Sequence, residues 1–375
     1  SSLFGQIPIN ADLSPNETVG PYSFTLEETD EVIFYLDATS NTNWAEAGNE
    51  SAVLTMFVDG DIVGYNQDIV IYNGDQLHTY KTMLGNLEAG DHTISFLFDY
   101  VKSSADADLI HLEEMYIFPA GSIYPQADVF KYSPILYGRD LFEWNESTRT
   151  DIPLIMWHEI TNEGDNKRIL YSMIFSNEDS RFGLGLAELM HSFGRTTDIE
   201  WVYEVLLDSD GTILEEIFQG PSHTTTEFNG TKIDLHPILK NVTLNCNFSD
   251  EGTSEYKFFL TPEYTLGELY TREVLMDDNP WTYKIMTEEM INEDKYEVPG
   301  DPATLTISDA RNYLYIEFNG SVVGSGVKLT FGVDFFGSCD VFYSDHEDTS
   351  FTSGYGGGWD RQVIEMPEDF DLSLV

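Results

Sequence analysis

The sequence predicts an all-β protein made of two β-sandwich domains of the jelly-roll type, the second larger and carrying short helical inserts. Aromatic residues make up 14% of the 375 residues, with 24 Phe and 21 Tyr, and such residues favour strands. Turn dipeptides that contain Gly recur at 59–60, 73–74, 210–211, 229–230 and 319–320. Short strands separated by such turns, about 8–12 residues apart, are typical of sandwiches. The length suggests at least two domains.

The first expected domain covers residues 1–119. Apolar and polar residues alternate in 52–58, a turn follows, and strand-like segments resume at 68–72, 78–84 and 92–98. This succession predicts antiparallel strands joined by short turns.

Residues 84–94, LGNLEAGDHTI, resemble the hairpin pattern L-x-x-L-x-x-G-x-H-x-[VIL] of jelly-roll carbohydrate-binding modules. The resemblance implies a β-sandwich, and the motif itself marks the fold and carries no information about a ligand. Members of this family stack sugar rings on exposed aromatic side chains, whose faces are flat and apolar. Trp44, Tyr65 and Tyr72 are the candidate stacking residues, and the alternative is that they belong to the core.

Residues 120–127 are the expected linker, because the stretch from Pro119 to Pro125 contains two prolines, a glycine and small polar residues. The second domain is then expected to cover 128–375. Two segments within it have apolar residues at helical spacing, 184–193 and 283–292. We therefore expect two helical inserts in a domain that is otherwise β.

Charge restricts the surroundings and partners of the chain. There are 66 Asp and Glu against 18 Lys and Arg, for a net charge of −48. Self-repulsion on this scale opposes folding unless salt or bound cations screen it. A phosphate backbone would be repelled, so no nucleic-acid partner is expected. The remaining partners are divalent cations, with calcium (Ca²⁺) as the expected ion, neutral glycans, and other copies of the chain.

Several features predict an extracellular or cell-surface location. The chain begins at Ser1 without a Met, and no apolar run is long enough to cross a bilayer. Seven N-x-S/T sequons are expected to carry glycans. Their asparagines are Asn16, Asn49, Asn145, Asn229, Asn241, Asn247 and Asn319. Cys246 and Cys339 are the two cysteines, and they either form a disulfide or stay as buried free thiols.

The densest candidate site begins the segment 198–205, which is expected to be a strand. Alternation would place Asp198, Glu200 and Glu204 on one face and Trp201 and Tyr203 toward the core. Two neighbouring carboxylates suit a hard cation. His223, on the next hairpin arm, is the expected third ligand. The alternative is an ordinary solvated strand face.

The same segment is similar to a motif of necrosis-inducing plant-pathogen toxins, G-H-R-H-D-W-E. Gly194, Asp198 and Glu200 match it in spacing, whereas Arg195 and Thr197 replace its two histidines. The segment 133–140, SPILYGRD, resembles the opening of a plant vacuolar-sorting-type domain. The toxin resemblance implies a β-sandwich with a divalent ion that engages lipid head groups, held by Asp198, Glu200 and His223.

The segment 208–212 is a second candidate cation site. Asp208 and Asp210 precede a Gly there, as at the start of calcium loops. Position twelve of such a loop is Gln219 rather than Glu, and a plain hairpin turn is the favoured interpretation.

The sequence contains no nucleophile elbow, P-loop, dinucleotide fingerprint or H-E-x-x-H motif. We therefore expect a binding or structural role at a cell surface, as in a surface layer, filament or adhesin. The alternative is a metal-dependent enzyme or a lipid-engaging effector centred on Asp198, Glu200 and His223.

Overall fold

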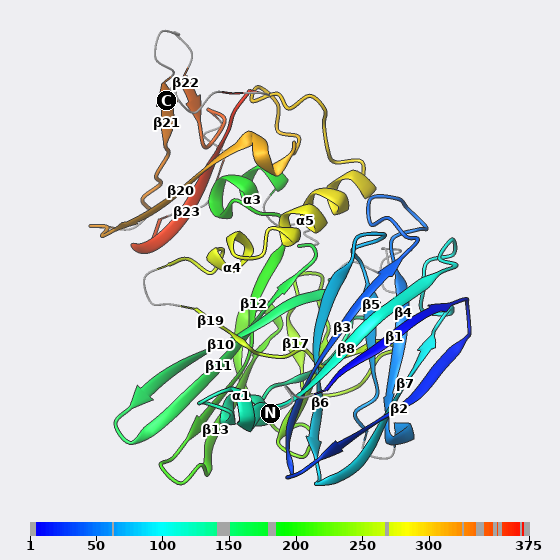
Figure 1. Cartoon of the computed structure of the whole chain (residues 1–375). Coiled ribbons are helices and arrows are strands. Elements are labelled where there is room, and N and C mark those ends of the chain that lie inside the picture. The colour runs from blue at the N-terminus through cyan, green and yellow to red at the C-terminus, as the bar shows by residue number, and fades with distance from the viewer. Residues whose placement is uncertain are drawn as a thin grey trace. The chain divides into compact units, whose positions relative to one another are not determined.

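The structure, a computed structural model, describes residues 5–61, 64–140, 151–178, 185–266, 270–324, 326–334, 341–347, 351, 355–367 and 370. It is built mainly of antiparallel β-sheets with few short helices, as the composition predicts (Figure 1). Contacts divide the chain into two compact units. The first contains 1–176 and 198–265, and the second contains 177–197 and 266–375.

The N-terminal sandwich of the first unit consists of two four-stranded sheets. One has the order β1-β8-β3-β6 and the other β2-β7-β4-β5. The strands are β1 (Gln6–Leu13), β2 (Thr18–Leu26), β3 (Asp30–Ser40), β4 (Ala52–Val58), β5 (Gln67–Ile71), β6 (His78–Leu87), β7 (Gly90–Phe98) and β8 (Ile110–Pro119), with the short helix η1 at Asp59–Asp61. The sheets pack face to face: the ring centroids of Phe34 and Phe96, one from each sheet, lie 6.1 Å apart.

The second sandwich of this unit has a six-stranded sheet, β14-β13-β12-β11-β10-β19, and a five-stranded sheet in which β17 joins β15-β16-β9-β18. Phe175 and Phe248 pack between the two sheets, with centroids 6.1 Å apart. The elements are α1 (Ala120–Ile123), α2 (Asp128–Lys131), β9 (Ile135–Tyr137), β10 (Pro153–Glu163), β11 (Asn166–Phe175), β12 (Asp198–Leu207), β13 (Ile213–Gly220), η2 (Pro221–His223), β14 (Thr224–Glu227), β15 (Lys232–Ile233), β16 (His236–Asn241), β17 (Phe248–Ser249), β18 (Lys257–Phe258) and β19 (Tyr264–Thr265).

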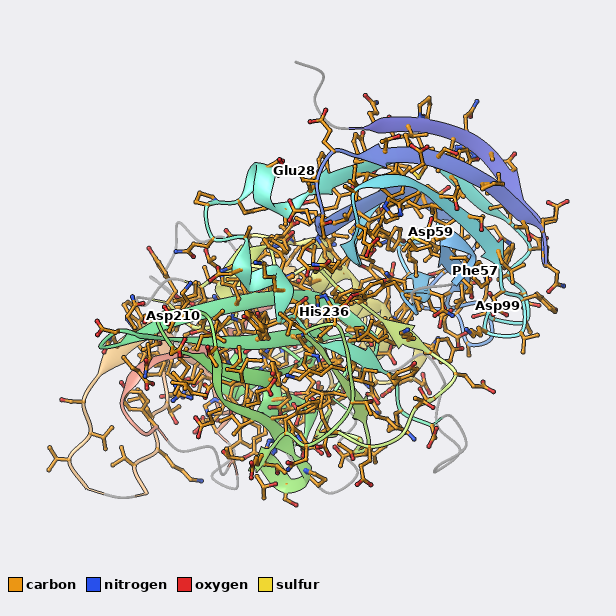
Figure 2. All side chains as sticks on the ribbon, turned by 90° about the horizontal axis from the view of Figure 1, so that it is seen from below. Glu28, Phe57, Asp59, Asp99, Asp210 and His236 are labelled. Atoms are coloured by element: carbon orange, nitrogen blue, oxygen red, sulfur yellow. The ribbon has the colours of Figure 1, made fainter. Side chains whose placement is uncertain are left out.

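The chain divides differently from the expected boundaries at 119 and 128. The expected linker contains α1, whose Gly121 N–H donates to Asp30 of β3 (2.9 Å). His236 of β16, marked in Figure 2, lies buried 3.1 Å from the carboxylate of Glu31 in β3. These polar contacts join the two sandwiches within one unit.

The second unit consists of the segment 177–197, which connects β11 to β12, and the C-terminal part of the chain from residue 266. The predicted helices at 184–193 and 283–292 correspond to α3 and α5, and both belong to this unit rather than to a sandwich insert. Its sheets are two-stranded, β20-β23 and β21-β22. The elements are α3 (Leu186–Phe193), α4 (Val274–Asp277), α5 (Trp281–Asn292), η3 (Ala310–Asn312), β20 (Tyr313–Gly320), β21 (Gly332–Asp334), β22 (Val341–Tyr343) and β23 (Gly358–Glu365).

Candidate functional site

A β-bulge in β12 decides where the predicted acidic residues point. Tyr203 pairs with Tyr171 and Trp201 pairs with the next residue, Ser172, so that Val202 is the extra residue. Trp201 and Tyr203 therefore face opposite sides of the sheet, and the prediction that they share the core face is wrong. The bulge resets the alternation on which that prediction depended.

The bulge also separates the three carboxylates. Asp198 pairs with Phe175 and Glu200 with Met173, two fully buried residues, so both acids lie on the inner face. Glu204 lies on the outer face, where it accepts a hydrogen bond from Arg168 (2.6 Å). The expected grouping of Asp198 and Glu200 with Glu204 is therefore wrong.

Glu200 and His223 do come together. Oε1 of Glu200 lies 3.5 Å from Nδ1 of His223, and Oε2 accepts from the Gln219 amide at 2.6 Å. The same Gln219 nitrogen lies 2.8 Å from Nδ1 of His223, and Asn245 lies 3.2 Å from its other ring nitrogen. Gln219 and Asn245 were missed by the sequence argument, since nothing local marks an amide as a partner of a carboxylate on the neighbouring strand or of a histidine beside another sheet.

Asp198 lies deeper, with 3% of its surface exposed, beside the thiol of Cys246. Burial raises the pKa of that thiol, and the negative charges of Asp151, Asp198 and Glu200 raise it further. Arg139 forms an ion pair with Asp151 (2.7 Å). The cluster is thus an acidic patch between sheets in which Cys246 stays protonated.

The side chains around Asp198, Glu200 and His223 are not arranged as a metal-binding site in the described part of the chain. Among the described residues, no group of three or more His, Cys, Asp and Glu side chains converges closely enough to hold a metal ion. The amide of Gln219 lies within hydrogen-bond distance of both Glu200 and His223, where a shared ion would have to sit. Calcium binding by Asp198, Glu200 and His223 therefore stays a prediction.

The loop at 208–212 is a hairpin turn between β12 and β13, as favoured from the sequence. Oδ1 of Asp208 accepts hydrogen bonds from the N–H groups of Asp210 (2.9 Å) and Thr212 (2.8 Å). Asp210 lies at the tip of this hairpin (Figure 2). The Asp208 carboxylate thus closes the turn by accepting two hydrogen bonds from the backbone of the same loop.

The predicted glycan-stacking residues are wrong. Trp44, Tyr65 and Tyr72 are 1%, 1% and 6% exposed, so none offers a ring face to a ligand. Tyr65 stacks on Phe259, with centroids 5.8 Å apart, and its hydroxyl donates to Asp234. All three residues lie in segments that connect strands, where the sequence has no alternation to show which side a ring takes, and here the three rings are buried.

A different set of rings is accessible on the outer face of the β1-β8-β3-β6 sheet. Tyr35 of β3 pairs with Tyr116 of β8, and Phe118 follows on the same face of β8. All three are half-buried. The rings of Tyr116 and Phe118 are 10° from parallel at 6.3 Å, and Tyr35 meets Phe118 edge-on at 5.2 Å. These three side chains are called the aromatic face below.

Polar groups border the aromatic face on both sides. Glu114 accepts hydrogen bonds from Tyr116 and Gln6, and these donors lower its pKa. On the other side Glu263 accepts from Tyr35 and from Lys81, whose ammonium lies 5.1 Å from the centre of the Tyr35 ring. Flat rings flanked by hydrogen-bonded carboxylates can contact a ligand with both apolar faces and hydroxyl groups.

The sequence contained a signal for this face. In 112–118, Leu112, Met115 and Ile117 are buried, and Tyr116 and Phe118 alternate with them. Aromatic residues at the polar positions of an otherwise alternating strand place rings on the accessible face of the sheet.

Three described sequon asparagines are exposed: Asn16, Asn229 and Asn319. Asn49 is half-buried and Asn145 lies outside the described residues. Asn241 and Asn247 are 1% and 0% exposed, so glycosylation there is contradicted by burial. The disulfide is also contradicted at Cys246, which is a buried free thiol; Cys339 lies outside the described residues.

Comparisons with known proteins give limited likenesses. No family model and no curated protein matches the chain. A ruminal GH26 endo-β-1,4-mannanase shares 12% identity at a TM-score of 0.21, over 34% of this chain and 27% of that chain. The EclA C-terminal domain, a sugar-binding protein, shares 11% identity at a TM-score of 0.21, over 32% of this chain and 83% of that chain. A GH26-CBM35 β-(1,4)-mannanase of Podospora anserina shares 11% identity at a TM-score of 0.21, over 36% of this chain and 35% of that chain.

Likenesses this slight carry no argument about fold or function. The chain spans about a quarter of the ruminal mannanase. Among the described residues, no helix has the length and hydropathy needed to cross a membrane.

Proposed function

We propose that this chain is a secreted surface protein that binds glycans through the aromatic face of its N-terminal sandwich. The observation that carries the proposal is the pair of nearly parallel rings, Tyr116 and Phe118, half-buried on the outer face of β8. The C–H faces of a sugar ring are apolar and stack on such rings.

The groups beside the rings suit sugar hydroxyls. The carboxylate of Glu114 has oxygens that accept from Tyr116 and Gln6, and each oxygen has a second lone pair for a sugar hydroxyl. Because the rings lie on the outer face of a sheet, they would contact one side of a chain of sugars. The proposed ligand is therefore an extended polysaccharide rather than a single enclosed sugar.

The charge selects among glycans. At −48 the protein repels acidic polysaccharides, and neutral polymers meet no such barrier. Neutral glucans or mannans are accordingly the proposed ligands, and hyaluronan or pectate serves as the acidic contrast.

The test is affinity electrophoresis in gels that contain glucomannan, mixed-linkage β-glucan or hyaluronan. We expect retardation by a neutral polymer and not by hyaluronan. Tyr116→Ala and Phe118→Ala should each weaken binding about tenfold, which corresponds to about 1.4 kcal/mol. The matched control is Phe24→Ala, which removes a half-buried ring from β2 in the other sheet of the same sandwich. Equal retardation of all variants would refute the role of the aromatic face.

Secretion, glycosylation and cation-dependent self-association complete the proposal. Support comes from the net charge and from exposed sequons at Asn16, Asn229 and Asn319. Divalent ions that neutralise carboxylates on neighbouring copies would turn mutual repulsion into assembly. Chelator-stripped protein titrated with calcium should show a rise in both melting temperature and light scattering. Stabilisation by molar salt alone, with no response to calcium, would eliminate this part.

A further inference from the structure

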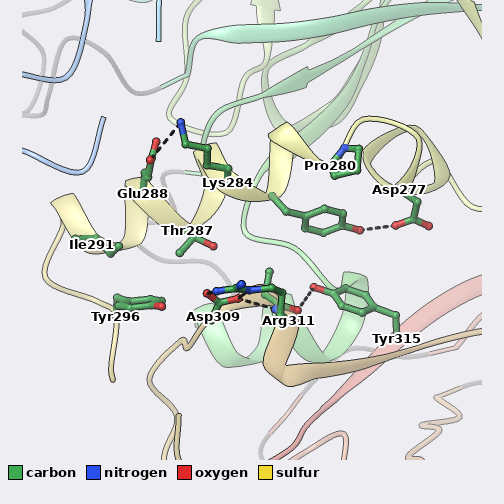
Figure 3. Close-up of a pocket in the computed structure, with 12 residues that line it drawn as sticks. Asp277, Pro280, Lys284, Thr287, Glu288, Ile291, Tyr296, Asp309, Arg311 and Tyr315 are labelled. Carbon is green, nitrogen blue, oxygen red and sulfur yellow. Dashed lines mark hydrogen bonds and ion pairs between the residues drawn. The ribbon is translucent and has the colours of Figure 1, made fainter. Parts of the chain in front are cut away.

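The second unit contains a cavity that the proposed function does not use. It has a volume of about 550 Å³ and lies between α5 and the turn η3 (Figure 3). Cavities of about 300–1,000 Å³ are typical of small-molecule sites. Residues that line it come from α5 and its N-terminal end and from the segment 296–315.

Tyrosine rings form much of the lining. Tyr283 of α5 and Tyr315 of β20 meet edge-on at 5.6 Å, and Tyr296 lies on the opposite wall from α5. The Tyr283 hydroxyl donates to Asp277 (2.7 Å) and the Tyr315 hydroxyl donates to the carbonyl of Ala310 (3.1 Å). Burial raises the pKa of both phenols, so the rings stay uncharged. Since these hydroxyls already donate elsewhere, the two residues present ring surface to the cavity.

The charged groups that line the cavity occur in opposite-sign pairs. Lys284 lies 3.5 Å from Glu288 on the next turn of α5. Arg311 forms a two-pronged ion pair with Asp309, at 2.8 and 2.7 Å, drawn as dashed lines in Figure 3. Asp277 accepts from Arg361. The charges of the lining residues are therefore already compensated by neighbouring side chains before a ligand enters.

A second, smaller cavity of about 490 Å³ adjoins the first and shares Tyr296, Asp309 and Arg311 with it. Glu297 and Asn312 add polar groups to its lining. The two cavities together provide a ring-lined compartment beside a polar one.

We propose that the larger cavity binds an uncharged small molecule that contains a planar ring, with its polar substituents directed toward Arg311 and the adjoining cavity. The ring stacks among Tyr283, Tyr296 and Tyr315, and no charge is needed because the lining pairs are internally neutral. This site is separate from the aromatic face in location and in ligand.

The test uses full-length protein and the uncharged fluorescent probe N-phenyl-1-naphthylamine. We expect saturable enhancement of its fluorescence. The anionic probe 1-anilinonaphthalene-8-sulfonate, which has similar rings, should bind at least about tenfold more weakly, because the lining has no uncompensated cation for its sulfonate. Glucomannan should not displace the probe, which separates this site from the glycan proposal.

Variants locate the binding. Thr287→Phe fills the cavity from α5 and should weaken probe binding at least about tenfold. The matched control, Thr225→Phe, places the same side chain at an exposed position of β14 and should leave binding unchanged. Ala310→Leu, from the opposite wall, gives an independent blocking variant if Thr287→Phe lowers the melting temperature.

Unchanged binding in a folded Thr287→Phe or Ala310→Leu variant would overturn the assignment. Equal affinity for the anionic probe would also overturn it, since it would indicate adsorption on exposed apolar surface.

Discussion

The aromatic face and the cavity of the second unit both present tyrosine rings, yet they are supported in different ways. Behind the aromatic face lie apolar side chains of an extended sheet, including Phe34, Leu36 and Ile117, all at most 4% exposed. The second unit instead buries charged groups: Arg195 pairs with Glu273 at 2.9 Å, and Arg361 donates to Asp277 and Glu317. Apolar packing does not depend on protonation, whereas buried ion pairs do. The comparison therefore predicts that a change of pH or the loss of a single charge affects the second unit more than it affects the apolar packing behind the aromatic face.

The largest expected effect comes from breaking the pair between Arg195 and Glu273. Arg195→Met leaves a carboxylate that is 5% exposed without its cation, at an expected cost of about 3–5 kcal/mol. Burial alone would raise the pKa of Glu273, and the charges of Arg195 and Arg272, together with the hydrogen bonds that Glu273 accepts, hold that pKa below its usual value. Hydrogen exchange should show lost protection in α3 and β23, with β3 and β8 unchanged.

Arg311→Met is the matched control, because the Arg311 side chain is 89% exposed and its ion pair with Asp309 is solvated. It should leave exchange protection almost unchanged. Equal loss of protection in β3 and β8 after Arg195→Met would refute the distinction between the two regions.

The next effect concerns Glu365 at the end of β23, which is 2% exposed and accepts a hydrogen bond from Ser308. Burial raises its pKa from 4.5 to about 7. Between these values the unfolded chain loses a proton that the folded chain retains, so stability falls as the pH rises through this window. The full loss is at most about 3–4 kcal/mol, from a difference of about 2.5 between the two pKa values at 1.36 kcal/mol per unit.

Glu365→Gln removes the titrating group and should flatten this decline. Urea denaturation at several pH values between 4.5 and 7.5 measures it, and Glu347→Gln, at an exposed position, is the control. A decline that survives in Glu365→Gln would assign it to other carboxylates.

The smallest effect tests the N-terminal sandwich itself. Gly85 has φ +87°, and a Cβ there would lie 2.2 Å from Cζ of Tyr65. Gly85→Ala should destabilise the chain by about 1–3 kcal/mol through backbone strain and overpacking. Gly48 has the same φ of +87° and open space around its Cβ position, so Gly48→Ala measures the strain alone. Equal cost in the two variants would mean that Tyr65 moves aside freely.

Sequence patterns predicted the elements better than the directions of their side chains. The helices at 184–193 and 283–292 were found because a spacing of three and four places apolar residues on one face, whatever they pack against. The meeting of Glu200 and His223 followed from the order of strand and hairpin. The bulge at Val202 could not be foreseen, because it depends on the register with β11.

The prediction of the glycan-stacking residues failed for a related reason. Tyr65 and Tyr116 are both aromatic residues in β-rich segments, and only the packing of a second sheet makes one core and leaves the other accessible. The division of the chain into units also escaped prediction, since contacts between distant segments such as Arg195 and Glu273 leave no local pattern.

The discontinuous second unit imposes an order on synthesis. Helix α3 emerges from the ribosome between two strands of the second sandwich, but it packs on β23, near the end of the chain. At about 5–20 residues per second, the ribosome needs on the order of ten seconds or more to deliver that partner. During this interval Leu189 and Met190, each 1% exposed in the finished fold, have no cover from β23. The newborn chain therefore carries an apolar helix that is a natural target for chaperones until translation is nearly complete.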